Sequence, residues 1–189
     1  MANIYTATKE IRGKKYTAQF NGISASLAAI DGAYIDNAGN IGLEKLSKYL
    51  FTHNLVEPQL SINDFGGDKI GETTEKVING KKYVAKFNGI LFALKAIDNS
   101  YVEGSNNTSL EKLSKFLIDK VIVEPEIKSI DDFETMEEFN EVIAFAREVM
   151  QGGEIMEEFN EVVAFLREVM QGNFREEENA STAKKGSKK

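Results

Sequence analysis

The segment GKKYTAQFNGISASLAAID, residues Gly13–Asp31, returns with 13 of its 19 residues unchanged as GKKYVAKFNGILFALKAID, residues Gly80–Asp98. The match continues without a gap through LEKLSKYL and LEKLSKFL to the tripeptide VEP, which ends at Pro58 in the first copy and at Pro125 in the second. Self-similarity over this length indicates a duplicated structural unit. The chain therefore contains two related modules, and one fold must explain both.

Each module starts with two segments in which apolar and polar residues alternate, as they do in a half-buried β-strand. IYTATKEI and KYTAQF lie around Arg12-Gly13-Lys14, and ETTEKVI and KYVAKF lie around Asn79-Gly80. Asn-Gly is a strong signal for a two-residue hairpin turn. We therefore expect a β-hairpin in each module. Asn21 and Asn88 follow the second strand and are candidate caps for the next helix.

Two helices are expected after each hairpin. The first has apolar residues at helical spacing, namely Ile23, Leu27 and Ile30, matched by Ile90, Leu94 and Ile97. The second has Leu43, Leu46 and Leu50, matched by Leu110, Leu113 and Leu117. We expect these stripes to face the core, and Pro58 and Pro125 to end the regular structure. Because a two-stranded hairpin needs a surface to pack on, we expect the two ββαα modules to pack together, with pseudo-twofold symmetry as one arrangement open to such a pair.

A second repeat lies near the C-terminus. MEEFNEVIAFAREVMQGG, residues Met136–Gly153, is followed by MEEFNEVVAFLREVMQG, residues Met156–Gly172, and the aligned residues differ only at 143/163 and 146/166. Apolar residues recur with the heptad spacing of an amphipathic or coiled-coil helix, and the opposite face carries Glu137, Glu138, Glu141 and Glu148. Gly152-Gly153 interrupts the pattern, so we expect two helices joined by a tight turn as an αα-hairpin.

Together these patterns predict an α+β protein of two tandem ββαα modules, an amphipathic αα-hairpin and a disordered tail. The first module is expected at residues 1–65, followed by a Gly-rich linker at 66–72. The second module is expected at 73–133 and the repeated helices at 134–172. Residues 173–189 are polar, charged and without periodicity, so we expect them to be disordered.

The composition limits the possible functions. Hydrophobic residues make up 42% and charged residues 28% of the chain, as in ordinary soluble globular proteins. The net charge of −7 argues against non-specific binding to nucleic acid, which depends on Lys and Arg. No apolar run approaches the roughly 20 residues of a membrane span, and the first residues lack the apolar segment of a signal peptide. We expect a cytoplasmic protein with no nucleic-acid or membrane partner.

No pattern points to catalysis. The sequence has no cysteine and one histidine, so neither a disulfide nor a His/Cys transition-metal site can be assembled. That histidine, His53, is matched by Lys120 in the second module, which favours a surface role. Recurring carboxylates such as Asp31 and Asp98 fit helix capping and solvent exposure, and their spacing matches no calcium loop. We therefore expect no enzymatic activity, no metal and no cofactor.

The apolar faces of the two terminal helices have two interpretations. They can cover the core of the modules, which is the commoner role of such a stripe, or they can bind an apolar partner helix, for which adaptable Met side chains are suited. Both roles are compatible if the helices cover the modules at rest and move out to engage a partner. The candidate residues for partner binding or self-association are Phe139, Ile143, Met150, Phe159, Val163, Leu166 and Met170.

The combination of YTATKEIRGKKYTAQFNG, LEKLSKYLF with VEP, and SIDDFETMEEFNEVIAFAREVMQG, closed by NFREEE and a Lys-rich end, resembles small tail assembly chaperones of long-tailed phages and prophages of Gram-positive bacteria. The resemblance extends from Tyr5 to about Glu178. It implies a non-enzymatic protein of the host cytoplasm that binds the long, apolar, helical tape measure protein and helps tail-tube subunits assemble around it. Members of this family are expected to have one module and one terminal helix, so the duplication departs from the pattern, whether it arose by natural fusion, by divergence or by engineering.

Two other functions fit an acidic protein without an active site. One is a structural subunit of a phage tail or neck, and the other is an acidic inhibitor of a nucleic-acid-binding enzyme. The family often produces a longer form by ribosomal frameshifting. The lysine pairs Lys184-Lys185 and Lys188-Lys189 fit either a slippery coding stretch or a plain charged tail.

Overall fold

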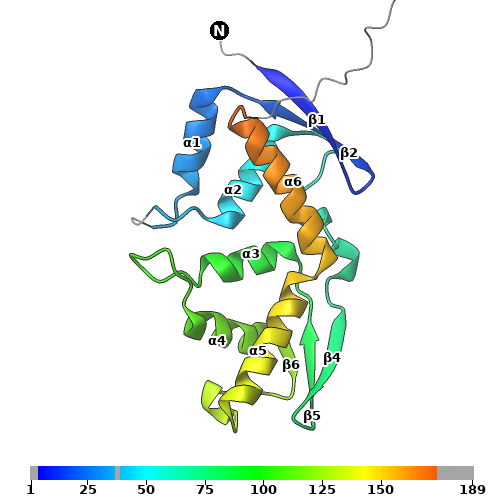
Figure 1. The fold of residues 1–189 in the computed structure, drawn as a ribbon, viewed down its shortest axis with the longest axis vertical. Helices are drawn as coiled ribbons and strands as arrows, with labels where there is room; N and C mark the ends of the chain where they lie inside the picture. Colours follow the sequence, from blue (N-terminus) through cyan, green and yellow to red (C-terminus); the bar gives the residue numbers. More distant parts are fainter. Residues whose placement is uncertain (1–3, 37–38, 174–189) are drawn as a thin grey trace, which may run out of the picture.

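A computed structural model describes residues 4–36 and 39–173. Within these ranges the protein is of the expected α+β class, with two three-stranded antiparallel sheets and six α-helices (Figure 1). The first half contains β1 (Tyr5–Ile11), β2 (Lys14–Phe20), α1 (Ile23–Ala33), α2 (Leu43–Tyr49), the π-helical turn η1 (Leu50–Asn54), β3 (Leu55–Glu57) and the 3-10 turn η2 (Ile62–Asp64). The second half contains β4 (Thr73–Ile78), β5 (Lys81–Lys86), α3 (Ile90–Asp98), α4 (Leu110–Lys120), β6 (Ile122–Glu124) and the 3-10 turn η4 (Ile130–Asp132). A short 3-10 turn, η3 (Gly67–Lys69), lies in the linker, and α5 (Met136–Gln151) and α6 (Glu154–Met170) end the described chain.

Both predicted hairpins are confirmed. Strand β1 pairs with β2 from Tyr5↔Phe20 to Ile11↔Lys14, and β4 pairs with β5 up to Ile78↔Lys81. The residues at the tips, Arg12 and Asn79, both have φ of 49°, and each is followed by a glycine with positive φ. Two consecutive residues with positive φ form the type of turn whose twist matches that of the two strands.

A third strand in each half was not predicted. Strand β3 pairs with β2, and β6 pairs with β5, so the hairpin's second strand is central in each sheet. Both strands are only three residues long, and both end at the residue before a proline. A residue before proline favours an extended backbone, which is the local reason for a strand at this place. The order in each half is therefore ββααβ instead of ββαα.

The expected apolar stripe of the first helix is correct for Ile90 and Leu94 of α3, whereas of the three residues in α1 only Ile30 packs against the core. In α3, Ile90 and Leu94 are buried, whereas their counterparts in α1, Ile23 and Leu27, are 73% and 57% exposed. Each helix faces its own half with small residues instead, namely Ser26, Ala29 and Ala33 in α1, and Ala93 and Ala96 in α3. Small residues let α1 lie close to α2, and α3 close to α4 and α5, and the larger residues are left for a different surface.

The second helix of each half mostly follows the prediction. Leu46 and Leu50 are buried, as are Leu113 and Leu117, whereas Leu110 at the start of α4 is 74% exposed. The asparagines do not cap the helix that follows them. Their side-chain amides instead donate to backbone carbonyls at the end of the second helical segment, Asn21 to His53 at 2.8 Å and Asn88 to Lys120 at 3.0 Å. The N-caps of α1 and α3 are glycines without a side-chain hydrogen bond.

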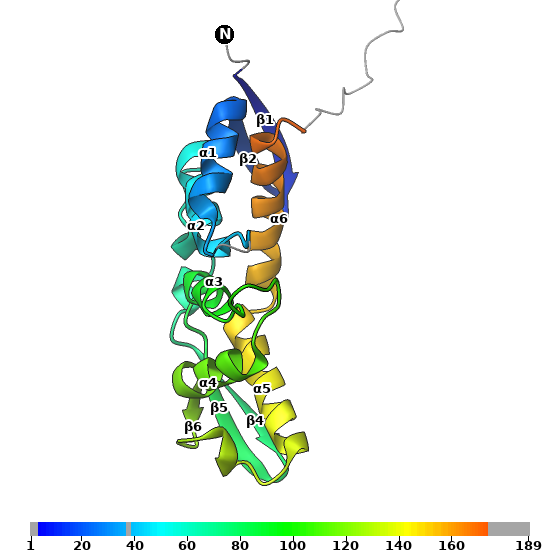
Figure 2. The same ribbon diagram turned by 90° about the vertical axis from the view of Figure 1, so that its left-hand side faces the viewer.

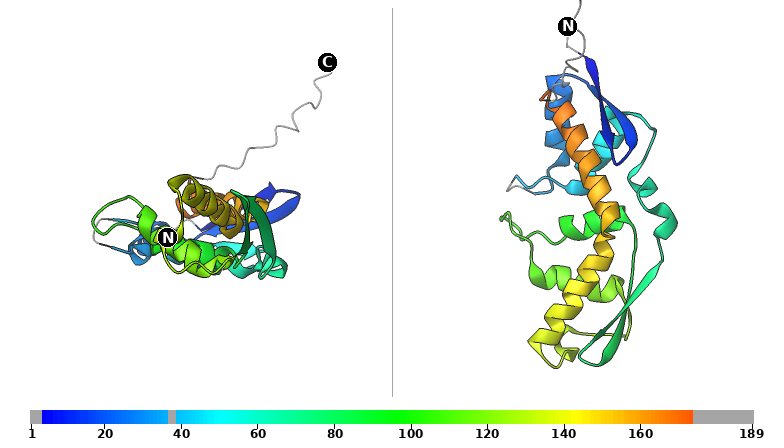
Figure 3. Two further views of the ribbon diagram at one scale, coloured as in Figure 1. Left: turned by 90° about the horizontal axis from the view of Figure 1, so that it is seen from below. Right: turned by 45° about the vertical axis from the view of Figure 1, so that its right-hand side comes forward.

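The terminal helices do not form the expected αα-hairpin. Helix α5 packs on β4, β5, α3 and α4 of the second half, whereas α6 packs on β1, β2 and η1 of the first half. The two helices follow one another along the long axis of the molecule (Figures 1 and 2), and a further view shows the same succession (Figure 3). The prediction failed because a Gly-Gly junction ends one helix and starts another without dictating that the chain must reverse.

Gly152 at this junction cannot be replaced without strain. Its φ is 65°, and its backbone N–H donates to the carbonyls of Glu148 and Val149, which ends α5. A Cβ at this position would lie 2.6 Å from the ring of Phe87. Only glycine adopts this conformation without a steric cost while also allowing such a close approach.

The terminal helices therefore cover the two halves in reverse order, because α5 covers the second half and α6 covers the first half. One core cluster joins the first half to α6, and the other joins the second half to α5. Val149 and Met156, on either side of the Gly-Gly junction, pack against both clusters. The expected tail at 173–189 lies, apart from Asn173, outside the described residues.

The two halves meet through α2 and α3. A twofold arrangement would also bring α1 to α4, but these helices lie well apart along the molecule (Figures 1 and 2). The arrangement is thus head to tail and not twofold. Among the described helices, none combines the length and the apolar character that crossing a membrane requires.

Candidate partner-binding site

The seven candidate residues lie at the interfaces between the terminal helices and the two halves. Four of them are buried in the core, namely Met150, Phe159, Leu166 and Met170. The other three, Phe139, Ile143 and Val163, are half-buried. Ile143 and Met150 of α5 lie in or against the cluster of the second half, and the four residues of α6 lie in or against that of the first. In this conformation they hold the helices in place, which is the core-covering role, and any partner that uses them must displace a helix.

The interface of α6 with the first half is rich in aromatic rings. Phe159 lies parallel to Phe51 at a centroid distance of 5.8 Å and edge-on to Phe65 at 5.4 Å. Its counterpart in α5, Phe139, has one such contact, with Phe133 at 5.4 Å. At the other end of α6, the hydroxyl of Ser26 donates to the carbonyl of Met170. The phenylalanine of the repeated motif therefore packs against more aromatic rings in the first half than in the second.

A glutamate, a tyrosine and a lysine form the same polar contact in both halves. In the first half, Glu158 of α6 accepts from the hydroxyl of Tyr16 at 3.2 Å and from the ammonium of Lys14 at 2.9 Å. The second half repeats this arrangement with a shorter tyrosine contact and a longer lysine contact. There Tyr83 donates to Glu138 at 2.6 Å, and Lys81 lies 3.2 Å from the same oxygen. Each terminal helix is thus tied to the hairpin of one half through the same position of its MEEF motif.

Burial and these contacts shift the pKa values of the groups involved. The side chain of Glu138 is 3% exposed, and the hydrogen bond from Tyr83, with help from Lys81, lowers its pKa below the usual range. Burial, reinforced by the glutamate beside each ring, raises the pKa of Tyr16 and of Tyr83 to about 12. Charged glutamates and neutral tyrosines therefore belong to the folded state.

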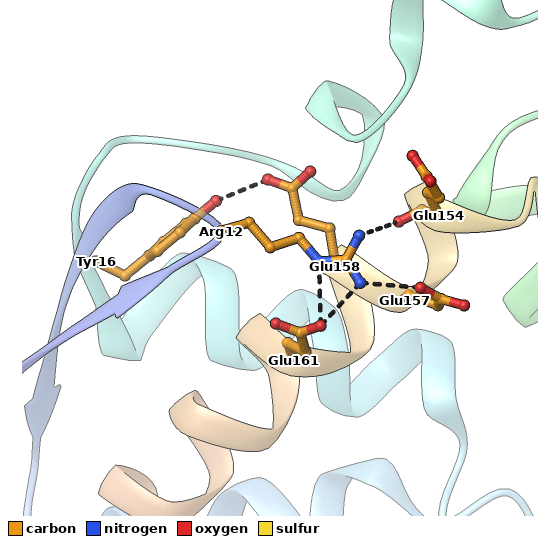
Figure 4. A network of polar contacts seen from close by, with 6 residues as sticks. All are labelled: Arg12, Tyr16, Glu154, Glu157, Glu158 and Glu161. Carbon is orange, nitrogen blue, oxygen red and sulfur yellow. Dashed lines mark hydrogen bonds and ion pairs between the residues drawn. The ribbon is translucent and has the colours of Figure 1, made fainter.

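Arg12 adds a contact that the second half lacks (Figure 4). From the tip of the first hairpin, its guanidinium donates to Glu161 at 2.9 and 3.1 Å, to Glu157 at 2.9 Å and to the carbonyl of Glu154 at 3.4 Å. These bonds, first to Glu161 and then to Glu157, raise its pKa further above the ordinary arginine value. The equivalent position in the second hairpin is Asn79. The polar contacts thus hold α6 at its first two turns.

Sequence reasoning missed this network. It placed Glu138 on the solvent side of the helix, but the structure buries it. A signal was present, because the GKKY motif of each module and the MEEF motif of each terminal helix recur in equal number. Equal copy number is consistent with one terminal helix for each hairpin, and the Tyr–Glu pairs are the contact between them.

The Ala146 and Leu166 difference reflects the two different surroundings. Both residues are fully buried, Ala146 in the core of the second half and Leu166 in that of the first. Helix α5 packs directly against α3, whereas the main contacts of α6 are with β1, β2 and η1. A small residue allows the close helix approach in the second half, and a larger one fills the space in the first.

A polar cleft of about 1030 Å³ lies between the halves and is lined by residues that include Glu44, Lys45, Asp98 and Glu103. Asp98 of α3 accepts from the backbone N–H groups of Leu43 at 2.8 Å and Glu44 at 2.9 Å, so it caps α2 of the other half. Burial raises the pKa of Asp98. Its carboxylate is engaged in capping, and no histidine lines this cleft.

The described residues offer no arrangement for metal or histidine chemistry. Within residues 4–36 and 39–173, no three His, Cys, Asp or Glu side chains gather in a way that could hold a metal ion. His53 is exposed, and its ring lies 4.6 Å from that of Tyr49. The conspicuous feature of the molecule is therefore the pair of grooves that hold α5 and α6.

Comparisons of the chain with protein-family models, with curated proteins and with solved structures find no match. Function is accordingly inferred from the residues of this chain and their geometry.

Proposed function

We propose that this protein is a non-enzymatic tail assembly chaperone that binds the apolar, helical tape measure protein of a long-tailed phage. The observation that carries the proposal is that each half holds an amphipathic helix with the same Met and Phe pattern in an apolar groove between hairpin and helices. We infer that a ββααβ module with one such helix is the repeating unit. A scaffold that accepts helices in this way suits a helical client, because amphipathic helices are commonly bound by their apolar face in a groove.

Helix α6 is the one that a client can displace. It is separated in sequence from the half that it covers, and the positive-φ glycines 152 and 153 are its only covalent link to the rest of the described fold. Helix α5, in contrast, follows directly on the second half. Release of α6 opens the first groove and leaves the second half and α5 in place.

The free energy needed to release α6 determines how much apolar surface a client helix must bury in its place. Helix α6 buries six apolar side chains, and burying a side chain of this size contributes about 1.5–3 kcal/mol. A competing helix must therefore present an apolar face of similar extent, since otherwise α6 returns. The tape measure protein implied by the sequence resemblance is long, apolar and helical, which meets this requirement.

Co-expression with the tape measure protein of a long-tailed phage whose genome carries this gene tests the proposal. The two proteins should co-purify, and hydrogen exchange should show the amides of α6 losing protection in the complex while those of α5 keep theirs. Failure to co-purify would contradict the function. A complex with α6 still protected would leave the function standing and contradict helix exchange.

A pair of matched variants sharpens this test. Arg12→Ala removes contacts to α6 from the tip of the first hairpin, so it should favour release and strengthen client binding. Lys81→Ala removes a lysine of the second hairpin that contacts Glu138 of α5 and should leave client binding unchanged. Equal effects of the two variants would show that α6 has no special role.

A further inference from the structure

Helix α3 is buried on two sides. Ala93 and Ala96 face the core of its own half, whereas Ile90 and Leu94, 1% and 3% exposed, belong to the core cluster of the first half. Ile90 and Leu94 thus form an apolar projection of α3, called the plug below, which packs against the first half. This plug is what joins the two halves.

The receiving surface is formed by α2, η1 and η2. Its apolar residues are Phe51, Leu60 and Ile62, which lie in or against the same cluster as the plug. Asp98, one turn beyond Leu94, completes the contact by accepting from the first two N–H groups of α2. An ion pair between Lys95 and Glu44, 3.8 Å apart, lies alongside.

Because the halves repeat, each contact surface has a second copy that remains open. The open plug is on α1, where Ile23, Leu27 and Asp31 correspond to Ile90, Leu94 and Asp98. Ile23 and Leu27 are 73% and 57% exposed, and Asp31 is exposed as well. Two large apolar side chains on one exposed helix face are costly to leave in water unless something covers them.

The surface that receives the plug is called the socket below, and its open copy is on the second half. A groove of about 550 Å³ there is lined in part by Ile118, Ile127 and Ile130, the counterparts of Phe51, Leu60 and Ile62. In the first half, Leu91 of α3 borders the equivalent groove, which is smaller at about 320 Å³. Beside it, Leu110 at the start of α4 is 74% exposed, and its counterpart Leu43 is packed against the core of the first half. Plug and socket therefore lie on different halves of one chain.

We propose that the protein self-associates head to tail, with α1 of one copy seated in the socket of a second copy as α3 is seated on the first half. Asp31 would then lie at the start of α4 of the neighbour as Asp98 lies at the start of α2, next to Ser109, whose hydroxyl already accepts from the N–H of Lys112. The occupant is a second copy because the surfaces on α1 and on the second half repeat the two sides of the contact already present inside the chain. A heterologous contact of this kind propagates into a ring or a filament.

The contact between copies is weaker than the one inside the chain. Leu91 and Lys95 of α3 are replaced by Ser24 and Ala28 in α1. The plug on α1 therefore lacks the apolar side chain of Leu91 and the ammonium group that Lys95 uses for its ion pair with Glu44. Separate copies also lack the covalent connection that raises the effective concentration of the two halves. Association should accordingly depend on protein concentration. This proposal does not rest on the identity of the client.

Sedimentation velocity of the full chain over a wide concentration range tests the proposal. The wild type should form species that grow with concentration, whereas Leu27→Asp in the plug and Leu110→Asp beside the socket should each remain monomeric. Val77→Asp, which replaces another exposed apolar residue (68%) on β4 away from both surfaces, should associate like the wild type. All three replaced side chains are exposed, so circular dichroism should show unchanged folding.

Mixing the two monomeric variants gives the decisive result. The Leu27→Asp chain keeps its socket and the Leu110→Asp chain keeps its plug, so an equimolar mixture should form a one-to-one complex and grow no further. A wild type that stays monomeric at every concentration, or a mixture of variants that stays monomeric, would overturn the proposal.

Discussion

Exchanging Ala146 and Leu166 between the terminal helices tests whether each helix is fitted to one half. The exchange leaves the composition of the pair unchanged and keeps both helices amphipathic. Both positions are 0% exposed. Leu166→Ala removes a fully buried side chain, which costs about 2–5 kcal/mol, and Ala146→Leu forces extra carbon atoms into a packed site, which costs about 1–3 kcal/mol.

The two costs should add, because the residues lie in different core clusters. The double variant is then about 3–8 kcal/mol less stable than the wild type, a large part of the roughly 5–15 kcal/mol that stabilises a typical domain. Urea unfolding followed by circular dichroism measures this loss. With a slope of about 1–3 kcal/mol per molar urea, the midpoint should fall by at least about 1 M.

The other difference between the helices supplies the control. Ile143 and Val163 are both half-buried, and exchanging them moves only one methylene group between two partly exposed sites. This exchange should be close to neutral. If the Ala146/Leu166 exchange shifts the urea midpoint no more than the Ile143/Val163 exchange does, the two helices are interchangeable and the fit inferred from the cores is wrong.

Three further outcomes are expected. The pKa of Glu138 is lower in the folded state than in the unfolded state. Its contribution to stability is therefore present above the unfolded pKa of about 4.3 and is lost as the pH falls through the lower folded pKa. Urea unfolding from pH 7 to pH 2 should show this loss of stability, and the loss should be smaller in Glu138→Gln. The pKa of Tyr83 is raised to about 12, so absorbance of the phenolate should appear late in an alkaline titration, and Tyr83→Phe should remove one late-titrating group. Gly152→Ala should destabilise the protein by about 1–3 kcal/mol because of the positive φ at this position, and the contact with Phe87 should add to this loss. Gly32→Ala, inside α1 with open space around it, should be neutral or stabilising. Thermal unfolding of both variants measures the difference.

Local patterns predicted the elements of this fold well. The alternating segments and the turn residues at 12–13 and 79–80 correspond to the two hairpins, and the helical periods correspond to α1 through α6. These features are set by neighbours in sequence, since a hairpin turn depends on two residues and a helix on spacing of three and four. The short strands β3 and β6 escaped because three residues carry almost no periodicity.

The candidate site was predicted less well for the same reason. The apolar residues of α5 and α6 were recognised, but the surface that they contact was not, because burial depends on residues far away in the chain. The stripe Ile23, Leu27 and its counterpart Ile90, Leu94 make the point. The residue types and the spacing of the two pairs are identical, yet one pair is exposed and the other is buried.

The sequence by itself determined the α+β class, the duplicated module, the positions of its hairpins and helices, and the presence of two matching amphipathic helices. Only the tertiary structure decided that α5 covers the second half and α6 the first, that the halves join head to tail through α3, and that α1 keeps its apolar face in solvent. The physical reason is that near-identical segments carry the same local preferences. What distinguishes one copy from the other is its order in the chain and the neighbours to which that order gives access.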